Sequence, residues 1–209
     1  DTIKKSELGY ALDEWTAFTD EAESKKYEIE FLDKTGLTIV RENKKFDRFK
    51  GRVIFPIHSM SGRILGFGGR ILGSDKKAAK YLNSPESLIY HKSKILYGLY
   101  QAKQSIAKED NCYLVEGYTD VISMSQAGVE NVVASSGTAL TADQIRLINR
   151  LTNNVTVLFD ADTISNGLER FNLGYFSFSQ GFVSRRTCSS LNPNNTNLGS
   201  DRFNCCSNS

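Results

Sequence analysis

Two short acidic motifs in this chain have the residue types and spacing that suit chemistry on phosphates. Glu116-Gly-Tyr-Thr-Asp120 directly follows the apolar run Cys112–Val115, and Asp160-Ala-Asp162 directly follows Val155–Phe159. Carboxylates grouped without histidine or thiolate suit a hard cation, of which Mg²⁺ is the usual one. A metal ion held in this way neutralises phosphate charge and orients an in-line displacement. A single acid at a strand end more often caps a helix or a turn, but two such motifs favour a metal site.

The formal net charge of +2 conceals three blocks of alternating sign. Residues 1–40 carry 5 lysines and 10 acidic residues, residues 41–103 carry 14 basic and 4 acidic residues, and residues 109–162 carry 2 arginines and 8 acidic residues. A basic block of this size is typical of a surface that binds a polyanion such as nucleic acid. The plainer alternative is that the blocks are the solvated faces of unrelated helices.

The apolar pattern predicts the elements that must position these side chains. Residues 1–40 read as helical, with core-facing stripes over Tyr10–Phe18 and Tyr27–Leu32. Residues 37–103 change to short β-rich runs separated by turns, which predicts a compact, basic segment that contains hairpins. The expected strands there lie at Leu37–Val40, Val53–Ile57 and Ile64–Phe67. The glycines at 66, 68 and 69 lack the context of a phosphate-binding loop, and tight hairpin geometry explains them better.

From residue 97 onward, helices and strands alternate. A helix over Tyr97–Lys108 precedes three buried strands, with helices between them, the last opened by a capping box at Thr141–Gln144. This alternation predicts a parallel sheet, and ligands of such sheets bind outside the carboxyl ends of the strands. The expected strands are Cys112–Val115, Val132–Ala134 and Val155–Phe159. Both acidic motifs would then lie at one edge of the sheet.

Composition limits the class of protein. The 209 residues, 40% hydrophobic and 24% charged, describe a globular chain of one or two domains without an apolar run long enough to span a membrane. Cys112 reads as a small buried side chain, and the other three cysteines lie in the last 22 residues. The absence of a Cys-x-x-Cys pair argues against structural zinc, and a reduced, cytoplasmic protein fits. His58 and His91 are interpreted as structural or surface residues.

The basic segments and acidic motifs, taken in order, resemble the RNA polymerase domain of the bacterial replicative DNA primase (DnaG type), which includes a Toprim fold. The resemblance covers about residues 8–162. It implies an α+β basic N-terminal subdomain over residues 1–103, a partial α/β Toprim subdomain with a parallel sheet over residues 104–162, and a tail outside the family pattern over residues 163–209. The matching segments are Arg52–Ile57, Gly62–Arg70, Lys80–Glu86, His91–Lys92, Leu96–Leu99, Glu116–Asp120, Ala134–Thr138 and Asp160–Asp162.

The resemblance also implies roles for individual residues. Glu116 is the expected catalytic acid, and Mg²⁺ (or Mn²⁺) would be held by Glu116, Asp120, Asp160 and Asp162. Ser84, Gly137 and Thr138 would support the site. The side chains expected to bind template or nucleotide are Arg52, Arg70, Lys80, Tyr81, Asn83 and Lys92. For Tyr81, base stacking and a packing role are equally compatible with the sequence.

The function implied by the resemblance is DNA-templated synthesis of short RNA primers by metal-dependent nucleotidyl transfer. The partners would be single-stranded DNA, nucleoside triphosphates and, through a helical domain that this chain lacks, the replicative helicase, at the replication fork in the bacterial cytoplasm. The second hypothesis is an inactive nucleic-acid-binding piece of a primase that keeps only the basic cleft. A different Toprim enzyme, such as a topoisomerase or nuclease, is a more distant alternative.

The chain departs from the family pattern in three places. The sequence contains neither the family's zinc domain nor its helicase-docking domain, and no Asp-Pro-Asp motif follows Asp162. The 47 residues from Thr163 contain 9 serines and 8 asparagines, which predicts a mostly disordered tail. We interpret the change as a frameshift or fusion, and the chain as an internal piece of a longer protein. We therefore expect an uncovered strand edge at Val155–Phe159, aggregation, and weak or no primase activity.

Overall fold

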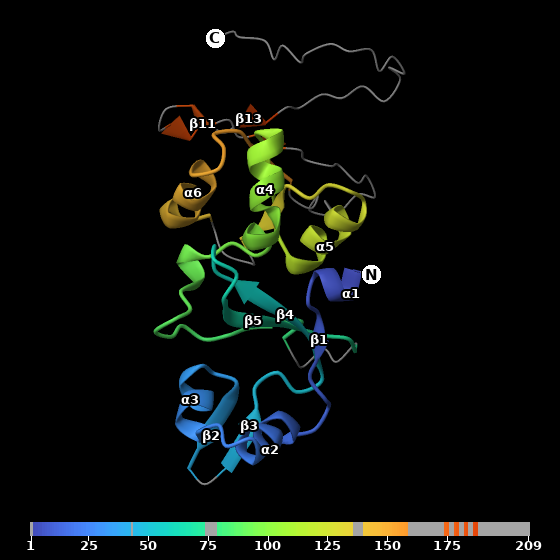
Figure 1. The fold of residues 1–209 in the computed structure, drawn as a ribbon, viewed down its shortest axis with the longest axis vertical. Helices are drawn as coiled ribbons and strands as arrows, with labels where there is room; N and C mark the ends of the chain where they lie inside the picture. The colour runs from blue at the N-terminus through green and yellow to red at the C-terminus, as the bar shows by residue number, and fades with distance from the viewer. Residues whose placement is uncertain are drawn as a thin grey trace.

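The computed structural model describes residues 2–42, 44–73, 79–135 and 140–158 in full, together with the backbone of four two-residue strands between residues 174 and 187. Figure 1 shows a lobe of helices and a hairpin at one end, a central antiparallel sheet, and an α/β unit at the other end. Helix α1 (Thr2–Lys5) lies beside α5 (Tyr118–Gln126) of the α/β unit, although the two are far apart in the sequence (Figure 1).

The N-terminal lobe is organised around one buried carboxylate. It contains α2 (Ala17–Ser24), α3 (Ile29–Lys34) and the hairpin of β2 (Thr38–Arg41) and β3 (Lys44–Asp47). Asp47, at the end of β3, accepts hydrogen bonds from the backbone N–H of Phe18 (2.7 Å) and from the N–H (3.0 Å) and hydroxyl (2.6 Å) of Thr19. Because the first N–H groups of a helix have no partner within it, Asp47 supplies the missing acceptors of α2. This fixes the helix against the hairpin.

The predicted helical stripe over Tyr10–Phe18 is wrong. Gly9–Tyr10 forms strand β1, which pairs with Val53 and Ile54, and the chain then runs irregularly to Thr16. Tyr10 is 53% exposed and Trp15 68% exposed, so this stripe does not enter the core. In the second stripe, Leu32 is buried but Tyr27 and Phe31 are exposed. Pairing with the free edge of β4 satisfies the backbone at residues 9 and 10, and this tertiary contact overrides the helical pattern.

The central sheet has the strand order β1-β4-β5-β6, and its glycines make room for aromatic rings. Its longer strands are β4 (Arg52–His58) and β5 (Ile64–Ile71), which confirm the two predicted strands, and β6 (Tyr81–Asn83) pairs with the end of β5. A Cβ atom at Gly66 would lie 2.7 Å from the ring of Tyr90, and one at Gly68 would lie 2.4 Å from the ring of Tyr118. The absence of a side chain at Gly66 and Gly68 therefore leaves space for two aromatic rings that belong to other elements.

The α/β unit contains α4 (Leu99–Glu109), β7 (Cys112–Val115), α5 (Tyr118–Gln126), β8 (Val132–Ala134), α6 (Ala142–Asn149) and β9 (Val155–Val157). The strands are parallel, as the sequence predicts, and their order in the sheet is β9-β7-β8. Cys112, Leu114 and Val133 are buried against Ile106 of α4. The capping box at Thr141 and Gln144 is confirmed. The predicted fold class, an α+β region followed by a parallel Toprim-type sheet, is therefore confirmed.

The edge at Val155–Phe159, expected to be uncovered, is paired in part: β10 (Gly174–Tyr175) pairs with β9 through Tyr175 and Thr156, and Phe159 lies outside the described residues. The strand β13 (Arg186–Thr187) continues this sheet, and β11 (Phe178–Ser179) pairs with β12 (Phe182–Val183). Unpaired backbone groups along a strand edge attract a further strand, which accounts for the pairing. The rest of residues 159–209, to which the prediction of a disordered tail applies, lies outside the described residues.

The helix α4 is reached through a short connection that ties the central sheet to the α/β unit. The 3-10 helix η1 (Lys92–Lys94) leads to Tyr97, whose backbone exchanges two hydrogen bonds with Ala134 at the end of β8 (2.9 and 3.0 Å). The buried amide of Gln144 donates to the carbonyls of Lys92 and Ile95 (3.2 and 2.8 Å). These contacts hold the segment between the two sheets in one conformation.

Candidate functional site

The first acidic motif lies at the carboxyl end of β7, where the parallel sheet opens to solvent. Glu116 is exposed in the turn that follows the strand, and Asp120 is half-buried in the first turn of α5. One oxygen of the Asp120 carboxylate accepts the backbone N–H of Gly117 (2.9 Å). Asp120 therefore fastens the turn that carries Glu116, and its second oxygen lies at the same turn.

Tyr118 joins this acidic turn to the basic central sheet. Its side chain is 2% exposed, and its hydroxyl donates a 2.7 Å hydrogen bond to the Oδ1 atom of Asn83 on β6. The ring stacks on Phe55 of β4 (centroids 5.2 Å apart, 17° between planes) and meets the edge of Tyr97 (4.6 Å, 79°). Burial raises the pKa of Tyr97 above its ordinary value, so its hydroxyl stays protonated at neutral pH.

A second contact crosses the same junction closer to solvent. The hydroxyl of Tyr81 on β6 lies 3.2 Å from the hydroxyl of Thr119. The guanidinium of Arg70, the residue paired with Tyr81 in the sheet, lies over the Tyr81 ring at 5.6 Å from its centroid. The structure thus brings three predicted binding residues, Arg70, Tyr81 and Asn83, next to the turn of Glu116 and Asp120.

Arg52, also predicted to bind template or nucleotide, has a different environment. It is 8% exposed, and its guanidinium donates to the carbonyls of Ala79 (2.9 Å) and Lys80 (3.4 Å). Burial lowers the pKa of the Arg52 guanidinium relative to its ordinary value. In this arrangement Arg52 holds the end of the segment that leads into β6. Binding of a ligand by Arg52 stays a prediction.

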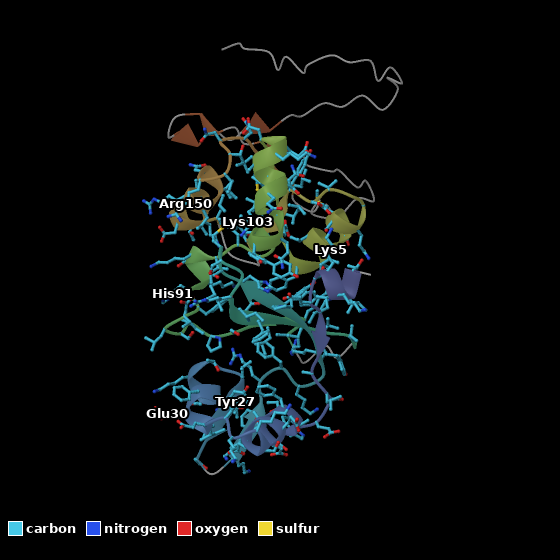
Figure 2. All side chains as sticks on the ribbon, in the orientation of Figure 1. Lys5, Tyr27, Glu30, His91, Lys103 and Arg150 are labelled. Atoms are coloured by element: carbon cyan, nitrogen blue, oxygen red, sulfur yellow. The ribbon has the colours of Figure 1, made fainter. Side chains whose placement is uncertain are left out.

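The two predicted lysines lie at different places. Lys80 is exposed at the start of β6. Lys92 opens η1, its backbone N–H donates to the carboxylate of Glu86 (2.9 Å), and its carbonyl accepts from Gln144 of α6. That N–H, and the adjacent His91, lower the pKa of Glu86. Figure 2 shows His91 at the level of the central sheet, on the side of α6. No contact that the structure describes links Lys92 to the Glu116–Asp120 turn.

Both histidines have structural or surface positions, as interpreted from the sequence. His58 is 8% exposed, with its Nε2 atom 2.8 Å from a carboxylate oxygen of Glu7 and its ring stacked on Tyr100. His91 is exposed, with Nδ1 3.1 Å from Glu86.

Sequence reasoning missed a group of exposed aromatic and basic side chains on the N-terminal lobe. Trp15 meets Phe46 edge to face (centroids 6.4 Å apart, 88°), and the Lys50 ammonium lies 4.8 Å from the centre of the Trp15 ring. Lys44 and Lys45 line an open hollow with these two rings. Trp15 was assigned to a buried helical stripe, and the single tryptophan beside a run of lysines in β3 was the signal that could have found this surface.

Arg48 is a second residue that the sequence did not single out. Its Nε and Nη2 atoms both lie 3.2 Å from the backbone carbonyl of Asn83, so its planar fork holds the residue that accepts from Tyr118. Burial lowers the pKa of this guanidinium as well.

The carboxylate oxygens at the Glu116–Asp120 turn are ligands of the type that a hard cation prefers. Glu116 offers an exposed carboxylate, and Asp120 offers the oxygen that Gly117 does not use. Mg²⁺ is commonly bound through one or two carboxylates while it keeps several waters. Among residues 2–42, 44–73, 79–135 and 140–158, no group of three or more possible metal ligands occurs. Asp160 and Asp162, like Gly137 and Thr138, lie outside the described residues.

Comparison with known proteins first defines the class. A family model described as Toprim-like matches residues 113–167, and one described as DNA primase catalytic core, N-terminal domain, matches residues 1–103. The RNA polymerase domain of Mycobacterium tuberculosis primase DnaG superposes with a TM-score of 0.72 at 36% identity, over 78% of this chain and 55% of that one. The E. coli primase catalytic core gives 0.70 at 41% identity, over 78% and 51%. The fold is thus that of a primase catalytic core with a Toprim-like unit.

Curated sequences agree with the structural comparison. A DNA primase from Synechococcus elongatus is 43% identical over 166 residues, which are 77% of this chain and 24% of the relative, and one from Halalkalibacterium halodurans is 46% identical over 162 residues, 77% and 27%. The chain belongs to the bacterial DNA primase family of the DnaG type. It spans about a quarter of the length of these curated relatives. In the described part of the chain, none of the helices has the length and apolar character needed to cross a membrane.

Proposed function

We propose that this chain supplies the basic and acidic halves of a primase active site, which synthesises short RNA primers on a DNA template by metal-dependent nucleotidyl transfer. The observation that carries the proposal is the junction of the Glu116–Asp120 turn with the β5–β6 hairpin through Tyr118 and Tyr81. It brings carboxylates suited to a cation next to Arg70, which is suited to phosphate. Action at the replication fork, with a replicative helicase as partner, is part of the same proposal.

The acidic turn would bind the cation. Glu116 and Asp120, together with the predicted ligands Asp160 and Asp162, would hold Mg²⁺, with Mn²⁺ as its substitute. The bound ion would neutralise the negative charge of the triphosphate. Glu116 offers an exposed carboxylate at the sheet opening, and Asp120 keeps the turn in place through the N–H of Gly117.

The basic side chains would bind nucleotide phosphates and the template backbone. Arg70, half-buried and held over Tyr81, is suited to a bidentate contact with phosphate. The exposed Lys80 and the half-buried Lys92 would supply longer-range attraction. Arg52 and Asn83 would contribute by holding the hairpin.

The Trp15 surface would bind single-stranded template. Trp15 offers an exposed ring and Phe46 a half-buried one for base stacking. Lys44, Lys45 and Lys50 lie beside these rings, Lys45 paired with Glu23 and Lys50 with Asp13. A relative described as the DnaG primase catalytic domain bound to ssDNA is 42% identical, with a TM-score of 0.70 over 78% of this chain, which supports a single-stranded partner.

Template-dependent incorporation of ribonucleotides, measured with Mg²⁺ and again with a chelator, tests the enzyme hypothesis. We expect Glu116→Gln to remove incorporation while single-stranded DNA binding stays within about twofold, because the carboxylate binds the cation and not the template. Glu109→Gln, on the exposed end of α4, is the matched control and should change neither. Loss of DNA binding equal to the loss of activity would contradict this division of roles.

The template surface is tested separately by fluorescence anisotropy with a labelled oligonucleotide. Trp15→Ala should weaken binding about tenfold, since stacking on one base contributes about 1–3 kcal/mol. Tyr27→Ala, which removes a similarly exposed aromatic ring from the same lobe (Figure 2), should leave binding unchanged. Equal effects of the two variants would refute the template surface.

The alternative function is nucleic-acid binding without catalysis, carried by the basic side chains of residues 41–103 alone. Binding that persists in chelator, in a chain that incorporates no ribonucleotide at any Mg²⁺ or Mn²⁺ concentration, would select this alternative.

A further inference from the structure

Of the two hydroxyl contacts that join the acidic turn to β6, the one made by Tyr118 is the more buried. The Tyr118 hydroxyl lies 2.7 Å from Oδ1 of Asn83, across 35 residues of sequence; Tyr118 is buried and Asn83 is half-buried. A buried hydroxyl that bonds to another element fixes the relative position of the two elements, because breaking the bond leaves an unsatisfied polar group.

We propose that Tyr118 is a positioning residue: its hydroxyl, acting through Asn83, holds the Glu116–Asp120 turn at a fixed place relative to the β5–β6 hairpin that carries Arg70. The inference rests on the proposed function, because it assigns the turn to a cation and the hairpin to phosphate. The inference adds a residue that contacts neither the cation nor the phosphate, but on which the distance between their two binding sites depends.

The ring of Tyr118 is held independently of the hydroxyl. It is stacked on Phe55, meets the edge of Tyr97, and lies against Gly68, where a Cβ would approach to 2.4 Å. Substitution by phenylalanine therefore keeps these ring contacts and removes the hydroxyl that bonds to Asn83.

Asn83 is held from its other side as well. The guanidinium of Arg48 bonds to its backbone carbonyl through two nitrogens at 3.2 Å each, while its side-chain oxygen accepts from Tyr118. This arrangement directs the amide oxygen of Asn83 towards Tyr118 and its amide nitrogen away from it. Asn83 therefore acts as the fixed point to which the acidic turn is tied.

Tyr118 is also well placed along its own chain. It is the first residue of α5, between Glu116 and Asp120, and the N–H of its neighbour Gly117 bonds to Asp120. A displacement of Tyr118 would move both carboxylates together. The Thr119–Tyr81 contact is the weaker, solvent-exposed companion of this tether.

The test compares Tyr118→Phe with Tyr90→Phe, which removes the hydroxyl of another buried tyrosine in the same aromatic cluster. Mn²⁺ binding is measured by the electron paramagnetic resonance signal of the free ion, and single-stranded DNA binding by anisotropy. Tyr118→Phe should weaken Mn²⁺ binding about fivefold and leave DNA binding within about twofold, as expected from the loss of one buried hydrogen bond. Tyr90→Phe should change neither.

Asn83→Ala and the double variant identify the partner. If the two residues act as one tether, Asn83→Ala should weaken Mn²⁺ binding as much as Tyr118→Phe, and the double variant should be no weaker than either. If instead Asn83 contacts the template directly, Asn83→Ala will weaken DNA binding while Tyr118→Phe does not, and the inference is overturned.

Hydrogen exchange separates this inference from the proposed function. Tyr118→Phe should accelerate amide exchange in residues 116–120 and leave exchange in the β2–β3 hairpin unchanged. Failure of the wild-type chain to bind Mn²⁺ contradicts the proposed cation site. In that case, amide exchange at residues 116–120 still tests whether Tyr118 holds the turn in place. Unchanged exchange there, or unchanged Mn²⁺ binding by Tyr118→Phe when the wild type binds, overturns the inference.

Discussion

Gly68 of β5 offers a sharp test of how the two halves of the molecule fit together. A Cβ atom at this position would lie 2.4 Å from Cε2, 2.6 Å from Cζ and 2.9 Å from the hydroxyl oxygen of Tyr118. All three distances are shorter than a van der Waals contact, so Gly68→Ala must displace the ring. The ring has little room to move because it is 2% exposed and confined by Phe55 and Tyr97.

The magnitude follows from two opposing contributions. Overpacking a confined core position costs about 3 kcal/mol. Replacing glycine by alanine recovers about 0.7 kcal/mol by reducing the conformational entropy of the unfolded chain. We therefore expect Gly68→Ala to lower the free energy of unfolding by about 2 kcal/mol, or the melting temperature by about 6 °C for a chain of this size.

Gly73 provides the matched control, since it follows the same strand and a Cβ there would meet nothing within 4 Å. Gly73→Ala should stay within about 0.5 kcal/mol of wild type. Urea unfolding followed by circular dichroism measures both variants, and the displaced ring should also weaken Mn²⁺ binding in Gly68→Ala. Equal stability of Gly68→Ala and Gly73→Ala would show that the ring is not packed as described and would refute the reasoning.

Two further predictions concern buried groups away from the site. Asp47→Ala removes the acceptors of the Phe18 and Thr19 N–H groups. It should lower the free energy of unfolding, measured in urea, by about 3 kcal/mol, because charge-assisted hydrogen bonds to a buried carboxylate are lost. An unchanged unfolding midpoint would contradict the role of Asp47 as the cap of α2. Burial raises the pKa of Cys112 to about 12 from 9.0, so this thiol should resist iodoacetamide at pH 8 and react in urea, as mapped by mass spectrometry. Because the thiol ionises at lower pH in the unfolded chain, its contribution to stability is complete below about pH 9 and declines as the pH rises towards 12; labelling of native Cys112 at pH 8 would contradict its burial.

The α/β unit was predictable because its pattern is local. The apolar runs of β7, β8 and β9, the helices between them, and the capping box at Thr141 all follow from residues near one another in the sequence. The N-terminal lobe was less predictable. Gly9 and Tyr10 join the distant strand β4, and α2 takes its cap from Asp47, about 28 residues further along the chain. Neither contact leaves a local pattern.

For the candidate site, too, the sequence predicted some features and missed others. The acidic motif and the basic block were visible in the sequence, since carboxylates after an apolar strand and clustered lysines and arginines are compositional signals. Which of the basic residues meet the acidic turn was not visible. Arg52 proved to be buried against backbone carbonyls, whereas Trp15, assigned to the core, proved to be exposed beside lysines.

By itself, the sequence determined the chemistry that this protein has available: carboxylates for a hard cation, arginines and lysines for phosphates, and a parallel sheet to carry the acids. The residue types and the order of the elements along the sequence do not depend on how the chain folds. Only the tertiary structure decided that Tyr118 would lie across Gly68 and bond to Asn83, and so which strands of the basic sheet lie beside the acidic turn. The physical reason is that the distance between the acidic turn and the basic strands depends on packing between residues tens of positions apart. That packing forms only when the two sheets pack together against the same aromatic rings.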